Sequence, residues 1–159
     1  MTLREHTPEV SNWLAQNGWH PGRDIGVVAE NLIRIRVEDA AGQGWRLEVS
    51  EAATRFIHSY GELELPYPGS SPEVTLNFDP TAGYHGDAEA FAELSEGLGR
   101  KVFPVGYESY EFGIWVVDEI GRFFYLHHTG GYFLGENEFE ALSLALSGKS
   151  RPDAEDFFV

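Results

Sequence analysis

Two adjacent histidines, His127 and His128, are the residues in this sequence that most invite a metal-ion hypothesis. The chain has six histidines, but neither an HExxH nor an HxH pattern occurs. Both residues fall on a predicted strand, where successive side chains point to opposite faces. We therefore expect that they do not bind one ion together, and we predict no metal site. The alternative is a metal-dependent hydrolase in which Glu136 or Glu138 completes the site.

Carboxylate pairs are the other residues that could do acid–base chemistry: Glu62 and Glu64, Glu108 and Glu111, and Asp118 and Glu119. Glycosidase-type catalysis needs two carboxylates opposed across a cleft, and closeness in sequence does not indicate that arrangement. The phosphate-binding loops GxxxxGK[ST] and GxGxxG are absent, as is the nucleophile elbow GxSxG. We predict no catalytic residue and no cofactor.

An acidic helix face is a candidate for binding another protein. Glu89, Glu93 and Glu96 are spaced i, i+4, i+7, which places them on one face of a predicted helix. Each close pair of like charges costs about 0.2–0.5 kcal/mol, and no lysine or arginine intervenes to offset it. A solvated helix face is the common explanation, but the arrangement also suits the Arg and Lys side chains of a partner.

A second candidate patch combines aromatic rings with carboxylates. Tyr107 and Tyr110 lie in a predicted loop flanked by Glu108 and Glu111, a composition typical of interface centres with a polar rim. Tyrosines buried beside a strand would look the same in sequence. Glu62 and Glu64 are expected to share one strand face and are included as candidate contacts; the alternative is a solvated sheet edge.

Secondary-structure patterning places these residues on an α+β framework. Helices are predicted over residues 8–17, 25–41, 50–60, 87–97 and 138–146, and strands over 63–65, 74–78, 101–105, 112–118, 122–127 and 132–134. Thr7, Ser50 and Asp87 are expected to be helix N-caps. Residues 25–41 also contain a strand-like alternation, but their length favours a helix. We predict a single domain with a mixed or antiparallel sheet and flanking helices.

Charge restricts the partners of this domain. The 159 residues carry 11 Lys and Arg against 26 Asp and Glu, a net charge of −15. Residues 59–159 contain five basic and 18 acidic residues, so −13 of the total lies there. Nucleic acid and anionic membranes are therefore not expected as partners, whereas a basic protein is. An acidic surface that only maintains solubility is the alternative.

Other features of the chain fit a cytoplasmic protein. No apolar run approaches the length of about 20 residues that a membrane-spanning helix needs. The N-terminus lacks the order of a secretory signal, and there is no cysteine, which fits a reducing compartment. Residues 149–159 are expected to be an acidic tail that either docks on the domain or frays.

Several short motifs together resemble a known family. They are NGWHPGR at residues 17–23, AATRFIHSYGEL at 52–63, GLGRKVFPVG at 97–106 and DEIGR at 118–122. In order and spacing they resemble the SUKH superfamily, specifically its third family of bacterial immunity proteins. One departure is that the family's GGL reads Gly61-Glu62-Leu63 here, which makes Glu62 a candidate partner-specific position.

The resemblance implies a function as well as a fold. It implies a SUKH-like domain over residues 1–148, no catalytic activity, and neutralisation of a cognate toxin domain of a polymorphic toxin system, of nuclease or deaminase type. Pro104, Gly106 and Gly121 would be determinants of the fold rather than of chemistry. A regulatory scaffold protein of the same superfamily is the alternative. The oligomeric state stays open.

Overall fold

Three helices open the chain in the computed structural model, which describes residues 2–159: α1 (Pro8–Gln16), α2 (Val27–Gly42) and α3 (Glu51–Tyr60). Two of the expected N-caps are confirmed. The Thr7 side chain accepts from the Val10 amide, and the Ser50 side chain accepts from the Ala53 amide. The ambiguous segment 25–41 is helical from Val27 onward, as its length predicted.

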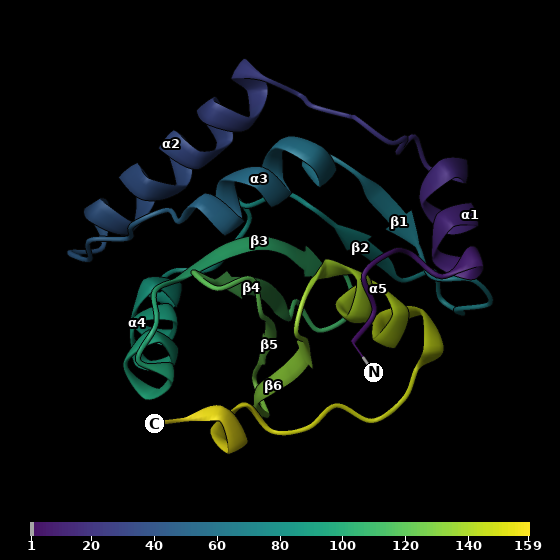
Figure 1. The fold of residues 1–159 in the computed structure, drawn as a ribbon. Coiled ribbons are helices and arrows are strands. Elements are labelled where there is room, and N and C mark those ends of the chain that lie inside the picture. Colours follow the sequence, from purple (N-terminus) through teal and green to yellow (C-terminus); the bar gives the residue numbers. More distant parts are fainter. Residues whose placement is uncertain (1) are drawn as a thin grey trace.

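One six-stranded sheet forms the centre of the molecule (Figure 1). Its strands are β1 (Glu64–Pro66), β2 (Thr75–Asn77), β3 (Val102–Glu108), β4 (Ile114–Asp118), β5 (Phe123–His127) and β6 (Gly130–Gly135). All pairings are antiparallel and the spatial order follows the chain order, so the sheet is antiparallel rather than mixed. The predicted β4–β5 hairpin is confirmed, with Gly121 at a φ of 95° in its turn.

Two further helices and one 3-10 helix complete the fold: α4 (Asp87–Leu98), α5 (Glu138–Ser147) and η1 (Ala154–Phe157). The expected role of Asp87 as N-cap of α4 is wrong, because Gly86 occupies the cap position in a left-handed conformation. Asp87 is instead the first residue of the helix, and its side chain is fully buried against Arg36 of α2. An N-cap pattern in sequence does not reveal a long-range ion pair that competes for the carboxylate.

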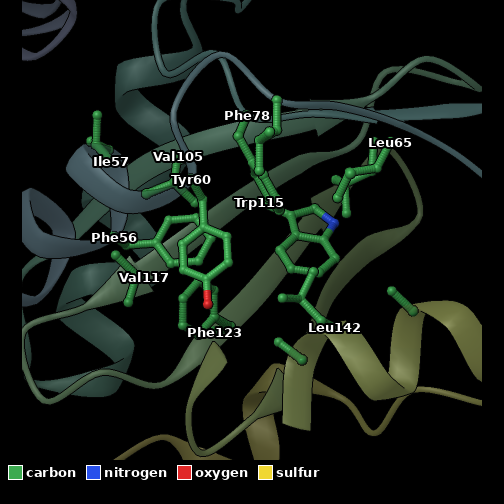
Figure 2. Close-up of a cluster of buried hydrophobic side chains, with 14 of the residues drawn as sticks. Phe56, Ile57, Tyr60, Leu65, Phe78, Val105, Trp115, Val117, Phe123 and Leu142 are labelled. Atoms are coloured by element: carbon green, nitrogen blue, oxygen red, sulfur yellow. The ribbon is translucent and has the colours of Figure 1, made fainter. Parts of the chain in front are cut away.

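The two faces of the sheet bury separate hydrophobic clusters. On one face, side chains of β3, β4 and β5 pack against α1, α3 and α5; Figure 2 shows Phe56 and Tyr60 of α3 beside Trp115 and Phe123 of the sheet. The opposite face is covered by α4 and η1, which form the second cluster. Helix α2 lies outside this sandwich and packs on α3 (Figure 1).

The C-terminal segment crosses from one face of the sheet to the other. After α5 it runs along β6, where the Phe133 amide donates to the Pro152 carbonyl. Phe157 then stacks on Phe133 with ring centroids 4.0 Å apart, and the Val159 amide donates to Gly97 at the end of α4. The expected alternative of a frayed tail is therefore not what the structure shows.

A buried ion pair connects α2 to α4. Arg36 Nη2 lies 2.6 Å from Asp87 Oδ2, and the two side chains are only 2% and 1% exposed. Gln43 also donates to the other carboxylate oxygen of Asp87, at 3.1 Å. The Arg36 guanidinium lies over the Phe91 ring, 4.9 Å from its centroid. These contacts fix the outer helix α2 relative to the sheet.

Candidate functional site

Strand register places several candidate residues in one row across the sheet. Glu64 of β1 pairs with Asn77 of β2, Asn77 pairs with Tyr107 of β3, and Tyr107 pairs with Ile114 of β4. Directly paired residues project from the same face of a sheet, so these four side chains share a face. Ile114 belongs to the cluster covered by α4, which identifies that face. Glu64 and Tyr107 therefore lie on the same face as Ile114, in the part of it that α4 leaves uncovered.

This open end of the face forms an acidic cleft of about 340 Å³. The term acidic cleft refers below to the residues that line it: Leu32, Glu62, Leu63, Glu64, Asn77, Phe78, Asp79 and Tyr107. It contains three carboxylates, and among residues 2–159 no lysine or arginine lines it. The structure thus brings together Glu62, Glu64 and Tyr107, three of the residues selected from the sequence.

Glu62 has an unusual backbone conformation at the rim of this cleft. Its φ is 67°, in the left-handed region that glycine adopts freely and other residues disfavour. The Glu62 amide donates to Phe78 across the start of the β1–β2 pair, which holds the residue there. The local fold therefore suits glycine at this position, yet the chain has an exposed carboxylate.

The acidic stripe of α4 lies on a different part of the surface. Glu89, Glu93 and Glu96 are all exposed, as predicted, on the side of α4 that faces away from its buried residues. Glu93 lines a groove of about 470 Å³ whose other carboxylates, Asp153 and Glu155, come from the C-terminal segment. The structure therefore does not join the stripe to the acidic cleft.

Glu96 lines a second groove beside α4, which has mixed charge. Arg46 and Lys101 line the same groove, about 370 Å³ in volume. Lys101 Nζ lies 2.5 Å from Glu48, so this cation is already paired within the chain. The stripe thus borders one acidic and one mixed groove rather than a uniform surface.

The predicted Tyr107–Glu111 patch is divided by the structure. Tyr107 and Glu108 lie on strand β3 rather than in a loop, and Tyr107 stacks on Phe112 with centroids 4.7 Å apart. Tyr110, 60% exposed, and Glu111 lie in the β3–β4 loop. Alternation along the strand explains the division, because Tyr107 and Glu108 project from opposite faces.

Glu108 differs most from expectation, because it is buried rather than part of an exposed rim. It is 8% exposed and accepts hydrogen bonds from Tyr67 Oη at 2.8 Å and Arg151 Nη2 at 2.9 Å. Burial, together with the Glu108 charge, raises the pKa of the Tyr67 hydroxyl well above its usual value. Glu108 therefore anchors the C-terminal segment through Arg151 and does not present a free carboxylate to a partner.

The histidine pair also differs from expectation. His127 is the last residue of β5 and His128 lies in the following turn, so strand alternation no longer separates them. Their ring centroids are 4.0 Å apart, and both imidazoles approach Glu111. Glu136 and Glu138 are not part of this group. The expectation that the two histidines point to opposite faces is wrong.

Comparison with known proteins now identifies the family. A model of the SUKH-3 immunity protein family matches residues 6–148, which is most of the chain. The chain belongs to the SUKH-3 immunity protein family. This SUKH-3 chain matches no curated protein and no solved structure. Within residues 2–159, the helices of this family member are too short or too polar to cross a membrane.

The structure explains the glycines of the SUKH-3 motifs in physical terms. Gly106 lies on β3, where a β-carbon would come within 2.5 Å of the Asn77 carbonyl oxygen of β2. The register shift between Pro104 and Gly106 occurs in the same segment. Gly121 needs its positive φ for the hairpin turn. Gly106 therefore determines backbone shape beside the acidic cleft, and Gly121 does so in the β4–β5 turn, away from the cleft.

Five residues that line the cleft were not selected from the sequence: Leu32, Leu63, Asn77, Phe78 and Asp79. Asn77 is 9% exposed and lies between the buried Leu76 and Phe78. Because it carries no charge, its place in the cleft could not be recognised from the charge pattern of the sequence. Leu32 reaches the cleft from α2, and nothing in the sequence pairs that helix with β1. Asp79 was included only in the overall excess of carboxylates over residues 59–159.

Proposed function

We propose that this SUKH-3 protein is a cytoplasmic, non-enzymatic immunity protein that binds and neutralises a cognate toxin domain of a polymorphic toxin system. The toxin domain would be basic, of nuclease or deaminase type, and binding would block its active site or substrate channel. The family supports the immunity role, and the net charge of −15 supports a basic partner. Nucleic acid and membranes are not expected to bind.

The acidic cleft is the surface that we assign to the toxin. Its three carboxylates can pair with Arg and Lys side chains, while Leu32 and Tyr107 supply apolar and aromatic contact area. Tyr107 is already held by stacking on Phe112, so little side-chain entropy would be lost on binding. The cleft thus combines a carboxylate rim with a pre-organised aromatic ring.

Glu62 is the single observation that carries this assignment. A non-glycine residue in the left-handed region costs about 1–2 kcal/mol, and the family's pattern has glycine at this point of the chain. The Glu62 side chain makes no hydrogen bond or ion pair among the described residues. Its charge lies near Arg23 and favours the charged form of that guanidinium, but a surface pair of this kind contributes only about 0–1 kcal/mol and does not offset the full cost. A carboxylate needed by a partner does explain it.

Co-expression and binding test the proposal directly. The protein is produced with the toxin domain encoded beside it, growth rescue is scored, and affinity is measured by calorimetry at 50 and 300 mM NaCl. Glu64→Lys in the acidic cleft should abolish rescue and weaken binding at least tenfold, because it places a cation opposite a basic surface. Glu136→Lys, the same charge change at an exposed site away from the cleft, is the matched control.

Three results would contradict the proposal. Absence of rescue by the wild-type protein would remove the immunity role. Equal affinity at the two salt concentrations would remove the electrostatic basis of binding. Equal toxin affinity of the Glu64→Lys and Glu136→Lys variants would show that the toxin does not bind at the cleft. Charge reversal at Glu89, Glu93 and Glu96 then decides whether the α4 stripe contacts the toxin instead.

A further inference from the structure

Three potential metal ligands meet at one corner of the sheet. Glu111 comes from the β3–β4 loop, and His127 and His128 come from the end of β5. His127 Nε2 lies 2.5 Å from Glu111 Oε2, and His128 Nε2 lies 3.5 Å from the same oxygen. One ligand atom from each residue can be chosen so that all lie within 4.8 Å of one another.

These distances suit a tetrahedral transition-metal ion. Zn²⁺ binds imidazole nitrogen and carboxylate oxygen at about 2.0–2.2 Å, which puts neighbouring ligand atoms about 3.3 Å apart. Small side-chain rotations therefore bring the three ligand atoms around one ion. Two imidazoles with one carboxylate are a ligand set preferred by Zn²⁺ and its neighbours rather than by Ca²⁺ or Mg²⁺.

The surroundings of His127 fix the orientation of its ring, as polar groups around metal-binding histidines do. Thr129 Oγ1 lies 2.8 Å from His127 Nδ1, and the Thr129 backbone N–H donates to the same nitrogen at 3.3 Å, so two contacts hold the ring with Nε2 toward Glu111. Tyr132 Oη lies 2.7 Å from Thr129 Oγ1 and extends this chain of polar groups. The His127 ring also stacks on Tyr125, with centroids 5.8 Å apart.

The backbone of the β3–β4 loop directs the carboxylate toward the histidines. Glu111 and Phe112 have φ values of 57° and 55°, two consecutive non-glycine residues in the left-handed region. Gly113 follows, where a β-carbon would clash with the Tyr125 ring. The loop thus curls back over β5 and places Glu111 beside His127.

We propose that Glu111, His127 and His128 bind one Zn²⁺ ion, with water in the fourth coordination position. The ion would join the β3–β4 loop to the end of β5 and so fix Tyr110 and Glu111 on the surface. The role assigned to the ion is structural, and no reaction is assigned to it. It stands independently of the toxin-binding proposal, because Glu111 does not line the acidic cleft.

Calorimetric titration with ZnCl₂ tests the site on full-length protein that has been treated with chelator and transferred to metal-free buffer. The expected result is one ion per chain with a dissociation constant in the micromolar range. His128→Ala and Glu111→Gln should each weaken Zn²⁺ binding at least tenfold. His20→Ala removes an exposed histidine elsewhere and should leave the affinity unchanged.

Two results would overturn the assignment. One is a dissociation constant above about 1 mM for the wild-type protein, and the other is equal Zn²⁺ affinity in wild-type and His128→Ala proteins. Because the His128 side chain is 63% exposed, the variant is expected to fold, and far-UV circular dichroism checks this. Titration with MgCl₂ is a further control and should show no binding at this site.

Discussion

Replacing Asp87 with alanine should destabilise the protein more than any surface substitution, because it leaves Arg36 buried without its main counter-ion. The two side chains are 2% and 1% exposed, and Nη2 lies 2.6 Å from Oδ2. The partner that remains to Arg36 is Asp39, at 3.3 Å and half-exposed. Removing one member of a buried pair typically costs about 3–5 kcal/mol.

The expected magnitude for Asp87→Ala follows from these contacts. The loss includes the Gln43 hydrogen bond and that of the Tyr84 amide, each worth about 1 kcal/mol, while Asp39 offsets part of the charge penalty. We therefore expect a decrease of about 3–4 kcal/mol in the free energy of unfolding. For a domain of this size that lowers the melting temperature by roughly 6–16 °C.

Urea denaturation followed by tryptophan fluorescence measures this difference, and a second variant isolates its cause. In the Asp87→Ala background, Arg36→Met removes the buried, unpaired charge and places an apolar side chain over Phe91. The double variant should therefore recover at least half of the lost free energy of unfolding. A loss below about 1 kcal/mol for Asp87→Ala would refute the assignment of a buried pair. A double variant no more stable than Asp87→Ala would show that the hydrogen bonds, not the charge, matter.

Three further predictions concern other parts of the chain. Glu62→Gly should keep or raise stability, by up to about 1 kcal/mol in chemical denaturation, while weakening toxin binding; a clear loss of stability would contradict the strain argument. His58 lies between Glu30 and Asp24, whose hydrogen bonds raise the pKa of its imidazole. The contribution of these hydrogen bonds to the free energy of unfolding is below about 1 kcal/mol. It is complete below pH ~6.5 and is lost as pH rises through the higher folded-state pKa of His58. The stability difference between wild type and His58→Gln should therefore shrink from pH 6 to 9, and a difference that does not change with pH would contradict this expectation. Phe157→Ala should cost about 2–4 kcal/mol, less if η1 detaches locally, and should increase amide exchange at Phe133 before the rest of β6.

Local patterns in the sequence predicted the helices and the central hairpin well, for a physical reason. The caps at Thr7 and Ser50 and the turn glycine at Gly121 act within a few residues, so the sequence around them contains the whole interaction. Asp87 looked the same as these caps. Its ion pair with Arg36, 51 residues away, decided its conformation instead.

The candidate site was predicted less completely, because it depends on register and on long-range contacts. Glu62, Glu64 and Tyr107 were each chosen from the sequence, but not as neighbours. Glu64 and Tyr107 lie close together because both pair with Asn77. Glu108 was misplaced because Arg151, which pairs with it, lies in the C-terminal segment, 43 residues further along the chain. One-residue alternation then separated it from Tyr107.

The strand order of this sheet has a consequence for how quickly the protein can fold. Because every strand pairs with its neighbours in sequence, the strands β3 to β6 can assemble within residues 102–135 without closing a long loop. Low sequence separation between contacting residues is associated with rapid folding among small domains. For the immunity role proposed above, rapid folding would shorten the interval between synthesis and protection, since protection begins only once the native surface exists.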